Sequence, residues 1–389
     1  MTATADPYPL KTHNELAFAR EFEGRCEVIS ASPAQIDFET SSRCNIRCYT
    51  CPKTYTKDNG EDASRELFDR MAEATFARAR SINLTGFGEP MISPHFEYFY
   101  EQCIQAGLQV GFVTNGSLLT EEWLERFSPS PVHLFLSVDA ADAATMKIMR
   151  PHLNFDKLSH ILSRYAKLHD ATGDTHRCQL YMQFVPTLQN IEQLPKVIEW
   201  AVESRAKRVE VLNFRPQDLP PEVAAQHIAN DLTRTSRAFA LARQRSHELR
   251  IPLVLPQGFE GEMMAETAGE VATSLAPVQI NKSGSKYPLA CSAPWFRVSI
   301  HQNGDVRPCC WYPYAMGNLW RQAFEEIWNG PNYQKMRRRI NTRFPQLGCK
   351  TCPMVWGITA GNPDSIFKKE GLIDRAHTWL QQTRRRFPR

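Results

Sequence analysis

The 389-residue sequence predicts an α/β protein, in which a partial (β/α)6 barrel precedes a small C-terminal α+β domain. Six strand patterns alternate with six helical patterns, and the strands are mostly apolar, as in a sheet covered by helices. The alternation stops after residue 256. Six units are two fewer than in a full (β/α)8 barrel. We therefore expect an open barrel with its active site at the carboxyl ends of the strands.

Each strand is predicted from a short apolar or alternating run, and each helix from apolar residues at helical spacing. Ser93 before Pro94, and Thr120 before an acidic turn, are expected to cap helices. The expected strands span 35–41, 81–85, 109–114, 132–138, 179–185 and 208–213. The expected helices span 65–80, 94–106, a segment starting near Thr120, 142–170, 191–204 and 221–249.

Changes in this pattern predict the domain boundaries. In the C-terminal region we expect a β-hairpin over 295–311 that turns at Asn303-Gly304, a helix over 320–340 and an amphipathic helix over 363–386. The predicted segments are an N-terminal extension (1–34), the barrel (35–256), a linker or lid (257–290), the small domain (291–357) and a helical tail (358–389).

The bulk composition is that of an ordinary soluble protein with a formal net charge of +4. No apolar run approaches the ~20 residues needed to cross a bilayer, and the first residues do not resemble a signal peptide. We expect a cytoplasmic protein without a membrane partner. The arginine runs 337–339 and 384–386 are interpreted as a solvated helix face and a solvated tail, so nucleic acid is not an expected partner. The sequence does not indicate an oligomeric state.

Eleven cysteines are unevenly distributed along the chain. Structural disulfides are rare in a reducing cytosol, so clustered cysteines there suggest metal binding. The early group follows the first predicted strand with C-x3-C-x2-C spacing and consists of Cys44, Cys48 and Cys51. Three thiolates can hold three irons of a [4Fe–4S] cluster and leave the fourth iron open to a ligand. The alternative is a zinc site completed by a distant His or Cys.

This loop resembles the signature of the radical S-adenosylmethionine (SAM) superfamily. In that family the open iron binds the amino and carboxylate groups of SAM. SAM is then cleaved to a 5′-deoxyadenosyl radical that removes a hydrogen atom from the substrate. One position departs from the family pattern: Thr50 precedes the third cysteine, where relatives often carry an aromatic residue.

The same resemblance implies a set of SAM-binding residues. The turn Gly86-Phe87-Gly88-Glu89-Pro90 is similar to the family's GGE element, in which the glycines admit a ligand and Glu89 faces the SAM ammonium. Thr114 with Asn115, and Ser137 with Asp139, match positions near the methionine and ribose of SAM in relatives. Ordinary turn chemistry and helix capping are the alternative interpretation of those two pairs.

The late cysteines suggest a second site. The residues around the predicted hairpin resemble the SPASM/twitch domains of radical SAM enzymes, which implies a second [4Fe–4S] cluster. Its expected ligands are Cys291, Cys309, Cys349 and Cys352, and a zinc site with the same ligands is the alternative. Cys309 is preferred to Cys310 because its spacing from Gly304 matches the family. Cys310 is then either a small buried apolar residue or a catalytic hydrogen-atom donor.

Two reactions agree with these features. An auxiliary cluster favours oxidation, such as dehydrogenation, whereas a thiol at Cys310 permits epimerisation. The expected enzyme is thus a radical SAM oxidoreductase or epimerase acting on a small molecule, such as a sugar or aminocyclitol in natural-product biosynthesis. It would receive electrons from a donor such as flavodoxin or ferredoxin. The alternatives are a maturase of a ribosomally made peptide, an RNA-modifying radical SAM enzyme and a zinc-binding interaction protein.

Overall fold

A single ten-stranded sheet forms the centre of the computed structural model. Its strand order is β10-β9-β8-β1-β2-β3-β4-β5-β6-β7, and all neighbours from β8 to β7 are parallel. The described residues are 8–57, 59–216, 219–256, 291–342, 345–350 and 352. The predicted lid (257–290) and tail (358–389) therefore lie outside the described residues, as do the arginines at 384–386.

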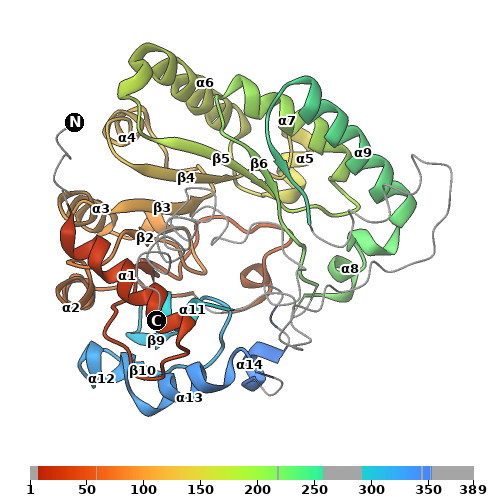
Figure 1. The fold of residues 1–389 in the computed structure, drawn as a ribbon. Coiled ribbons are helices and arrows are strands. Elements are labelled where there is room, and N and C mark those ends of the chain that lie inside the picture. Colours follow the sequence, from red (N-terminus) through yellow and green to blue (C-terminus); the bar gives the residue numbers. More distant parts are fainter. Residues whose placement is uncertain are drawn as a thin grey trace, which may run out of the picture.

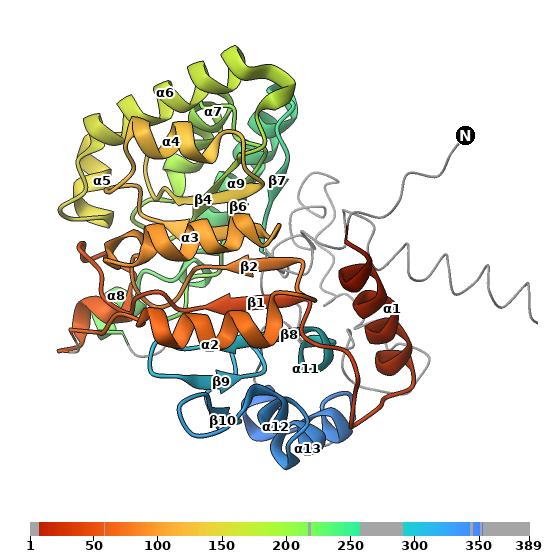
Figure 2. The same ribbon diagram turned by 90° about the vertical axis from the view of Figure 1, so that its left-hand side faces the viewer.

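The first six strands follow the predicted order of strand–helix units. The strands are β1 (Gln35–Phe38), β2 (Ser81–Asn83), β3 (Gln109–Thr114), β4 (Val132–Ser137), β5 (Gln179–Phe184), β6 (Val209–Val211) and β7 (Leu253–Val254). The helices are α1 (Pro9–Glu23), α2 (Arg65–Thr75), α3 (Phe96–Gln105), α4 (Glu121–Phe127), α5 (Ala143–Met149), α6 (Phe155–Thr172), α7 (Leu194–Glu203), α8 (Pro221–Ala224) and α9 (Leu232–Glu248). Figures 1 and 2 show α2, α3, α4 and α6 following one another along the outer side of the sheet.

N-cap hydrogen bonds fix the starts of several of these helices, and aromatic side chains pack the helices on the sheet. Side-chain oxygens of Ser64, Thr120 and Asn154 accept hydrogen bonds from the first turns of α2, α4 and α6. On α2, Phe68 is buried and packs edge-to-face on Phe38 of β1 and in a stacked geometry on Phe99 of α3. Such aromatic contacts fix the helical layer against the sheet, so that the strand ends meet at one edge.

Three predicted helical segments differ from the structure. The stretch predicted over 221–249 is divided into α8 and α9, with residues 225–231 between them. Ser93 does not cap α3, which begins at Phe96 with His95 as its N-cap. Instead, Ser93 ends a short 3-10 helix, Pro90–Ile92, whose start is fixed by Glu89. The helix predicted over 320–340 is two helices, because Asn329 leaves the helical path to exchange hydrogen bonds with the backbone of Ile29.

The C-terminal hairpin extends the barrel sheet. Its elements are α11 (Ala293–Phe296), β8 (Arg297–Ile300), β9 (Asp305–Arg307), β10 (Gly317–Asn318), α12 (Phe324–Trp328), α13 (Pro331–Arg339) and α14 (Leu347–Lys350). β8 pairs in parallel with β1, from Gln35 opposite Arg297 to Phe38 opposite Ile300. The turn contains Gly304 with a φ of +87°, as the predicted Asn-Gly turn requires. The C-terminal region therefore contributes one wall of the barrel.

Arg337 corrects the interpretation of the 337–339 run as a solvated face. Its side chain is 2% exposed and donates hydrogen bonds to the carbonyl groups of Pro294 and Glu27. Burial lowers its pKa to about 10. Arg338, next to it, is exposed and pairs with Glu27, so only part of the run faces solvent. Among the described helices, none has the length and apolarity needed to cross a membrane.

Candidate functional site

The loop of Cys44, Cys48 and Cys51 begins just beyond the carboxyl end of β1. Backbone hydrogen bonds from Cys51 N to Cys48 O (3.1 Å) and from Glu89 N to Arg43 O (2.8 Å) hold the loop against the turn after β2. All three thiols are partly buried and close enough to interact electrostatically. The structure therefore brings the predicted cluster ligands together at the expected edge of the sheet.

The surroundings of these thiols favour a bound cation. Burial raises the pKa of Cys48 to about 11 and also raises the pKa of Cys44. Metal ligation requires thiolates, so the positive charge of a cluster's irons would offset this desolvation. Two donors already face the sulfur atoms: Arg150 Nη1 lies 3.6 Å from Cys48 Sγ, and Asn115 Nδ2 lies 4.0 Å from Cys44 Sγ. Three thiols on one loop with flanking donors fit an iron–sulfur cluster.

Arg150, which the sequence did not single out, forms a buried ion pair with Asp139. Arg150 Nη2 lies 2.8 Å from Asp139 Oδ2, and the two side chains are 7% and 0% exposed. Burial works to lower the pKa of Arg150, but the Asp139 carboxylate and the Cys48 thiol hold it above its ordinary value. The other Asp139 oxygen accepts a hydrogen bond from Val185 N (2.9 Å). The pair thus links the ends of β4 and β5 to the cysteine loop.

The turn after β2 requires glycine at two positions because other chain segments lie against it. A Cβ atom at Gly86 would lie 2.1 Å from Cγ of Glu39, and one at Gly88 would lie 2.0 Å from the Arg43 carbonyl oxygen. Neither gap admits a methyl group. The glycines therefore allow the turn to contact both the segment after β1 and the cysteine loop. They were predicted to let a ligand approach the backbone, but in the structure it is other parts of the protein that approach it.

Glu89 is 2% exposed and organises the neighbouring strand end. Its Oε1 accepts from Thr114 Oγ1 and its Oε2 from Asn115 N, both at 2.7 Å. Burial raises the pKa of Glu89, although these hydrogen bonds oppose the shift. Oε1 also accepts from Met91 N (3.3 Å), whereas Oε2 retains a second lone pair, and contact with a SAM ammonium stays a prediction. Pro90 begins the following 3-10 helix, and Ser137 is the half-buried last residue of β4.

The C-terminal cysteines also gather in one place. Cys309 is close enough to interact electrostatically with Cys291, and Cys349 interacts in the same way with Cys309 and Cys352. Burial raises the pKa of Cys349 to about 12, and it raises that of Cys309 strongly. Within the described residues, no three His, Cys, Asp or Glu side chains are grouped as ligands of one metal ion. Cys309 thus lies near both Cys291 and Cys349, and Cys349 lies near Cys352.

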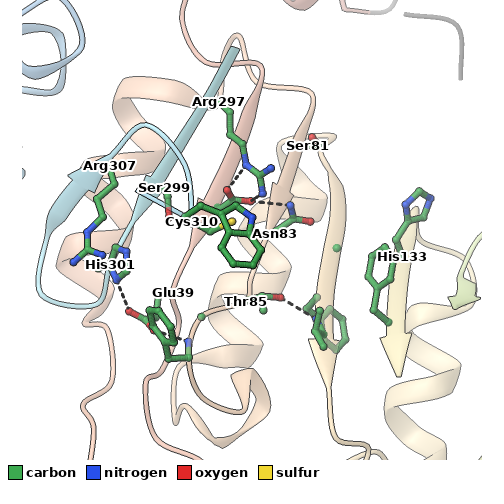
Figure 3. A pocket seen from close by; sticks show the side chains of 18 of the residues that line it. Glu39, Ser81, Asn83, Thr85, His133, Arg297, Ser299, His301, Arg307 and Cys310 are labelled. Carbon is green, nitrogen blue, oxygen red and sulfur yellow. Dashed lines mark hydrogen bonds and ion pairs between the residues drawn. The ribbon is translucent and has the colours of Figure 1, made fainter. Parts of the chain in front are cut away.

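The interior of the barrel contains a cavity of about 670 Å³. Polar side chains on alternate residues of β1 and β8 face it, together with residues of β2 to β6 and of the segment after β9 (Figure 3). The turn residues Gly86 and Phe87 line the cavity as well, so it borders the predicted SAM site. The cavity therefore offers space for a substrate next to the residues predicted to bind SAM.

The charged pairs that line this cavity were not predicted from the sequence. Asp37 on β1 pairs with Arg297 on β8 and accepts a hydrogen bond from Asn83 (2.8 Å). Glu39 accepts from Phe87 N (2.7 Å) and pairs with His301 Nδ1 (3.0 Å). Burial alone would raise the pKa of Glu39, but these bonds hold it below its usual value. Polar residues alternate with apolar ones in β1 and β8, and this pattern could have indicated that one face of each strand lines a polar cavity.

Cys309 and Cys310 face different surroundings. Cys309 packs among the C-terminal cysteines and the core, whereas Cys310 lines the cavity near Arg297 and Asp37 (Figure 3). The Cys310 side chain is accessible from the cavity although protein surrounds most of it, and this partial burial raises its pKa. The arrangement agrees with the choice of Cys309 as ligand and leaves Cys310 facing the space available to a substrate.

Comparison with known protein families identifies both halves of the site. Residues 38–176 match the Radical SAM superfamily, and residues 291–353 match SPASM, an iron–sulfur cluster-binding domain. The chain is a radical SAM enzyme with a SPASM domain. Its cofactors are therefore SAM and [4Fe–4S] clusters, one in the radical SAM domain and one in the SPASM domain.

Curated radical SAM relatives differ in what they modify. The chain is 28% identical to a tungsten-containing aldehyde ferredoxin oxidoreductase cofactor-modifying protein of Pyrococcus furiosus, over 47% of this chain and about half (52%) of the relative. It is 26% identical to the AdoMet-dependent heme synthase of Methanosarcina barkeri, over 79% and 85% of the two chains. It is 24% identical to the PqqA peptide cyclase of a Methylobacterium species, over 84% and 81%.

A solved structure supports the fold. Streptococcus suis SuiB, bound to the precursor peptide SuiA, superimposes with a TM-score of 0.59 and 15% identity, covering 88% of this chain and 73% of SuiB. The partial barrel with its C-terminal extension is thus an arrangement that radical SAM enzymes share.

Proposed function

We propose that this radical SAM enzyme is a maturase of a ribosomally made peptide and removes a hydrogen atom from a carbon of one peptide residue. Relatives that modify peptides match most of the chain, and the similar fold of SuiB accepts a precursor peptide. These similarities favour the peptide alternative over the small sugar or aminocyclitol expected from the sequence. The Pyrococcus and Methanosarcina relatives have other substrates, so the peptide requires a direct test.

One observation supports this proposal most strongly: the turn of Gly86 and Phe87 borders both the predicted SAM site and the 670 Å³ cavity. A residue in the cavity would lie beside SAM, as hydrogen-atom transfer requires, because reacting atoms must approach closely. The C-terminal wall of the same cavity carries Cys310, next in sequence to the predicted auxiliary ligand Cys309. The cavity thus borders the SAM-binding elements on one side and the SPASM domain on the other.

In this proposal, Cys44, Cys48 and Cys51 hold the cluster of the barrel, and Cys291, Cys309, Cys349 and Cys352 hold the auxiliary cluster. The clusters, when bound, supply the electron that cleaves SAM and a second redox centre. Arg150 faces the Cys48 sulfur, and Asp139 holds Arg150 in place. Glu89 positions Thr114 and Asn115 at the end of β3.

Oxidation of the peptide, by dehydrogenation or cross-linking, is the proposed outcome because the SPASM domain contributes a wall of the cavity. Epimerisation is the second candidate, and the position of Cys310 in the cavity favours it. A thiol there would return a hydrogen atom to the substrate carbon, and the thiyl radical that it leaves would be restored by one electron from the external reductant and one proton from solvent.

Iron and acid-labile sulfide should be measured after anaerobic reconstitution, together with 5′-deoxyadenosine formed from SAM and a reductant. We expect about eight irons per chain in the wild type and about four in the Cys44→Ala/Cys48→Ala/Cys51→Ala variant. The variant should form no 5′-deoxyadenosine. Cys26→Ala is the matched control, because this half-buried cysteine lies outside both groups. Zinc in place of iron, or 5′-deoxyadenosine formation without the three cysteines, would contradict the proposal.

The substrate and the outcome can be tested with a library of short peptides in D2O. Oxidation removes two hydrogen atoms, so a modified peptide loses 2 Da. Epimerisation through a thiol adds one deuterium, because the thiol proton exchanges with solvent, and the Cys310→Ala variant should then form no epimer. A wild-type enzyme that forms 5′-deoxyadenosine but modifies no peptide would refute the peptide proposal while leaving SAM cleavage intact.

A further inference from the structure

Two of the three arginines that line the cavity are not paired with its carboxylates. Its three acidic residues are each compensated: Asp37 by Arg297, Glu39 by His301, and Glu210 by Arg208 and a hydrogen bond from Gln183 (3.0 Å). Two further cations, Arg215 and Arg307, also line the cavity. Neither forms an ion pair with any described residue. The cavity wall therefore presents two guanidinium groups that have no carboxylate partner among the described residues.

Arg215 and Arg307 are held differently. The Arg215 guanidinium lies over the Trp311 ring at 4.4 Å from its centroid, and its side chain is exposed. Arg307 is partly buried, and its Nε atom is inaccessible to solvent and has no hydrogen-bond partner in the described part of the chain. The Nη1 and Nη2 atoms of Arg307 are not buried in this way and bond to no described residue, so an acceptor on a ligand in the cavity would pair with them.

The β8–β9 pairing places other polar groups near Arg307. Arg307 lies opposite Ser299, and His301 follows Ser299 by two residues, just beyond the end of β8. The Nε2 atom of His301 is also buried without a partner among the described residues, since only Nδ1 contacts Glu39. In Figure 3, Arg307 and His301 lie together at one end of the pocket, with Ser299 between Arg307 and Arg297. One face of the hairpin thus places the unpaired Arg307 guanidinium beside His301 and Ser299 at the cavity wall.

From this arrangement we infer that the pocket face of the β8–β9 hairpin is a carboxylate-binding subsite, with Arg307 as its principal residue. The inference rests on the proposed function and makes it more specific: the peptide would carry an acidic side chain or a free C-terminus near the reacting residue. Planar guanidinium groups suit carboxylates because they donate two parallel hydrogen bonds. The paired carboxylates of Asp37, Glu39 and Glu210 do not supply that partner.

Binding of short peptides to the reconstituted holoenzyme with SAM tests the inference without knowledge of the natural substrate. The probes are acetyl-Gly-Glu-Gly-amide, acetyl-Gly-Gln-Gly-amide and acetyl-Gly-Gln-Gly with a free carboxyl terminus. A charge-assisted hydrogen bond predicts that one acidic probe binds the wild type about tenfold or more tightly than the neutral amide. The probe that shows this preference distinguishes a side-chain carboxylate from a C-terminal one.

Arg307→Gln should abolish the preference, and Arg307→Lys should keep part of it because the charge remains. Arg321→Gln is the matched control, since Arg321 lies outside the cavity and is exposed in the same domain. Equal binding of all three probes to the wild type would overturn the inference, as would a preference that survives Arg307→Gln or disappears in Arg321→Gln. A large loss of SAM affinity in Arg307→Gln would also overturn it, by assigning Arg307 to the carboxylate of SAM.

Iron content and 5′-deoxyadenosine formation are measured on the same wild-type preparation. If both are normal and the probes bind equally, the subsite is wrong and the radical SAM function stands. If 5′-deoxyadenosine is not formed, the proposed function itself fails.

Discussion

The buried ion pair between Arg150 and Asp139 makes a quantitative prediction about stability. Replacing Arg150 with Met leaves the Asp139 carboxylate fully buried with one hydrogen bond, from Val185 N, and no cation. Removing one partner of such a pair typically costs about 3–5 kcal/mol. A chain of 389 residues unfolds with an entropy of about 0.8 kcal/mol/K near 60 °C, so each kcal/mol lowers Tm by about 1.2 °C. The expected loss is therefore about 4–6 °C.

Scanning calorimetry of the cluster-free protein should be used, because Arg150 also faces Cys48 and a change in cluster content would add to the shift. Arg164→Met is the matched control: its pair with Glu121 is exposed on both sides (42% and 44%), and such pairs contribute at most about 1 kcal/mol. The double variant Arg150→Met/Asp139→Asn should recover most of the loss, since no unpaired charge remains buried. Equal shifts for Arg150→Met and Arg164→Met, or no recovery in the double variant, would refute this reasoning.

Three further predictions concern the turn, the cavity and the pH dependence of stability. Gly88→Ala should lower the iron content from about eight to about four per chain, because the added Cβ would displace the cysteine loop at Arg43. The control Gly173→Ala should keep all the iron, because no atom lies within 4 Å of the added Cβ. Equal losses of iron in the two variants would contradict this account. Cys310→Ala should leave a 2-Da oxidation of the peptide intact, and loss of that product would contradict the assignment of Cys310 to epimerisation alone. Burial lowers the pKa of His133 to about 4 from an unfolded value near 6.5, so the unfolded state binds the proton more readily. The contribution of His133 to the free energy of unfolding is therefore complete above pH 6.5 and is lost as the pH falls toward 4. Between pH 7 and pH 5 the free energy of unfolding should fall by about 2 kcal/mol. This loss should shrink in calorimetry of His133→Gln but not of His160→Gln, which alters an exposed histidine.

Features encoded by neighbouring residues were predictable from the sequence. The six strands and the position of the cysteine loop after the first strand follow from short-range patterns, and the structure contains them. The Asn303-Gly304 turn was predictable for the same reason, since the turn geometry itself demands glycine.

Contacts between distant segments were not predictable in this way. Asp37 and Arg297 are 260 residues apart, and they meet because β8 joins the edge of β1. Arg337 was interpreted as solvated because its neighbours are arginines, but the carbonyl groups of Pro294 and Glu27 come from elsewhere and bury it. Arg150 lies outside every recognised motif, and only the packing of α5 beside the cysteine loop reveals its position.

The pairing of β1 with β8 has a consequence for biosynthesis. One edge of β1, among the first strands to leave the ribosome, obtains its partner only when residues 297–300 have been made. At about 5–20 residues per second, roughly 13–50 s separate the synthesis of the two strands. During that interval β1 presents unpaired backbone donors and acceptors, which favour association with other chains. Slower elongation would lengthen this exposure, so heterologous yields should depend on the translation rate and on chaperones that cover strand edges.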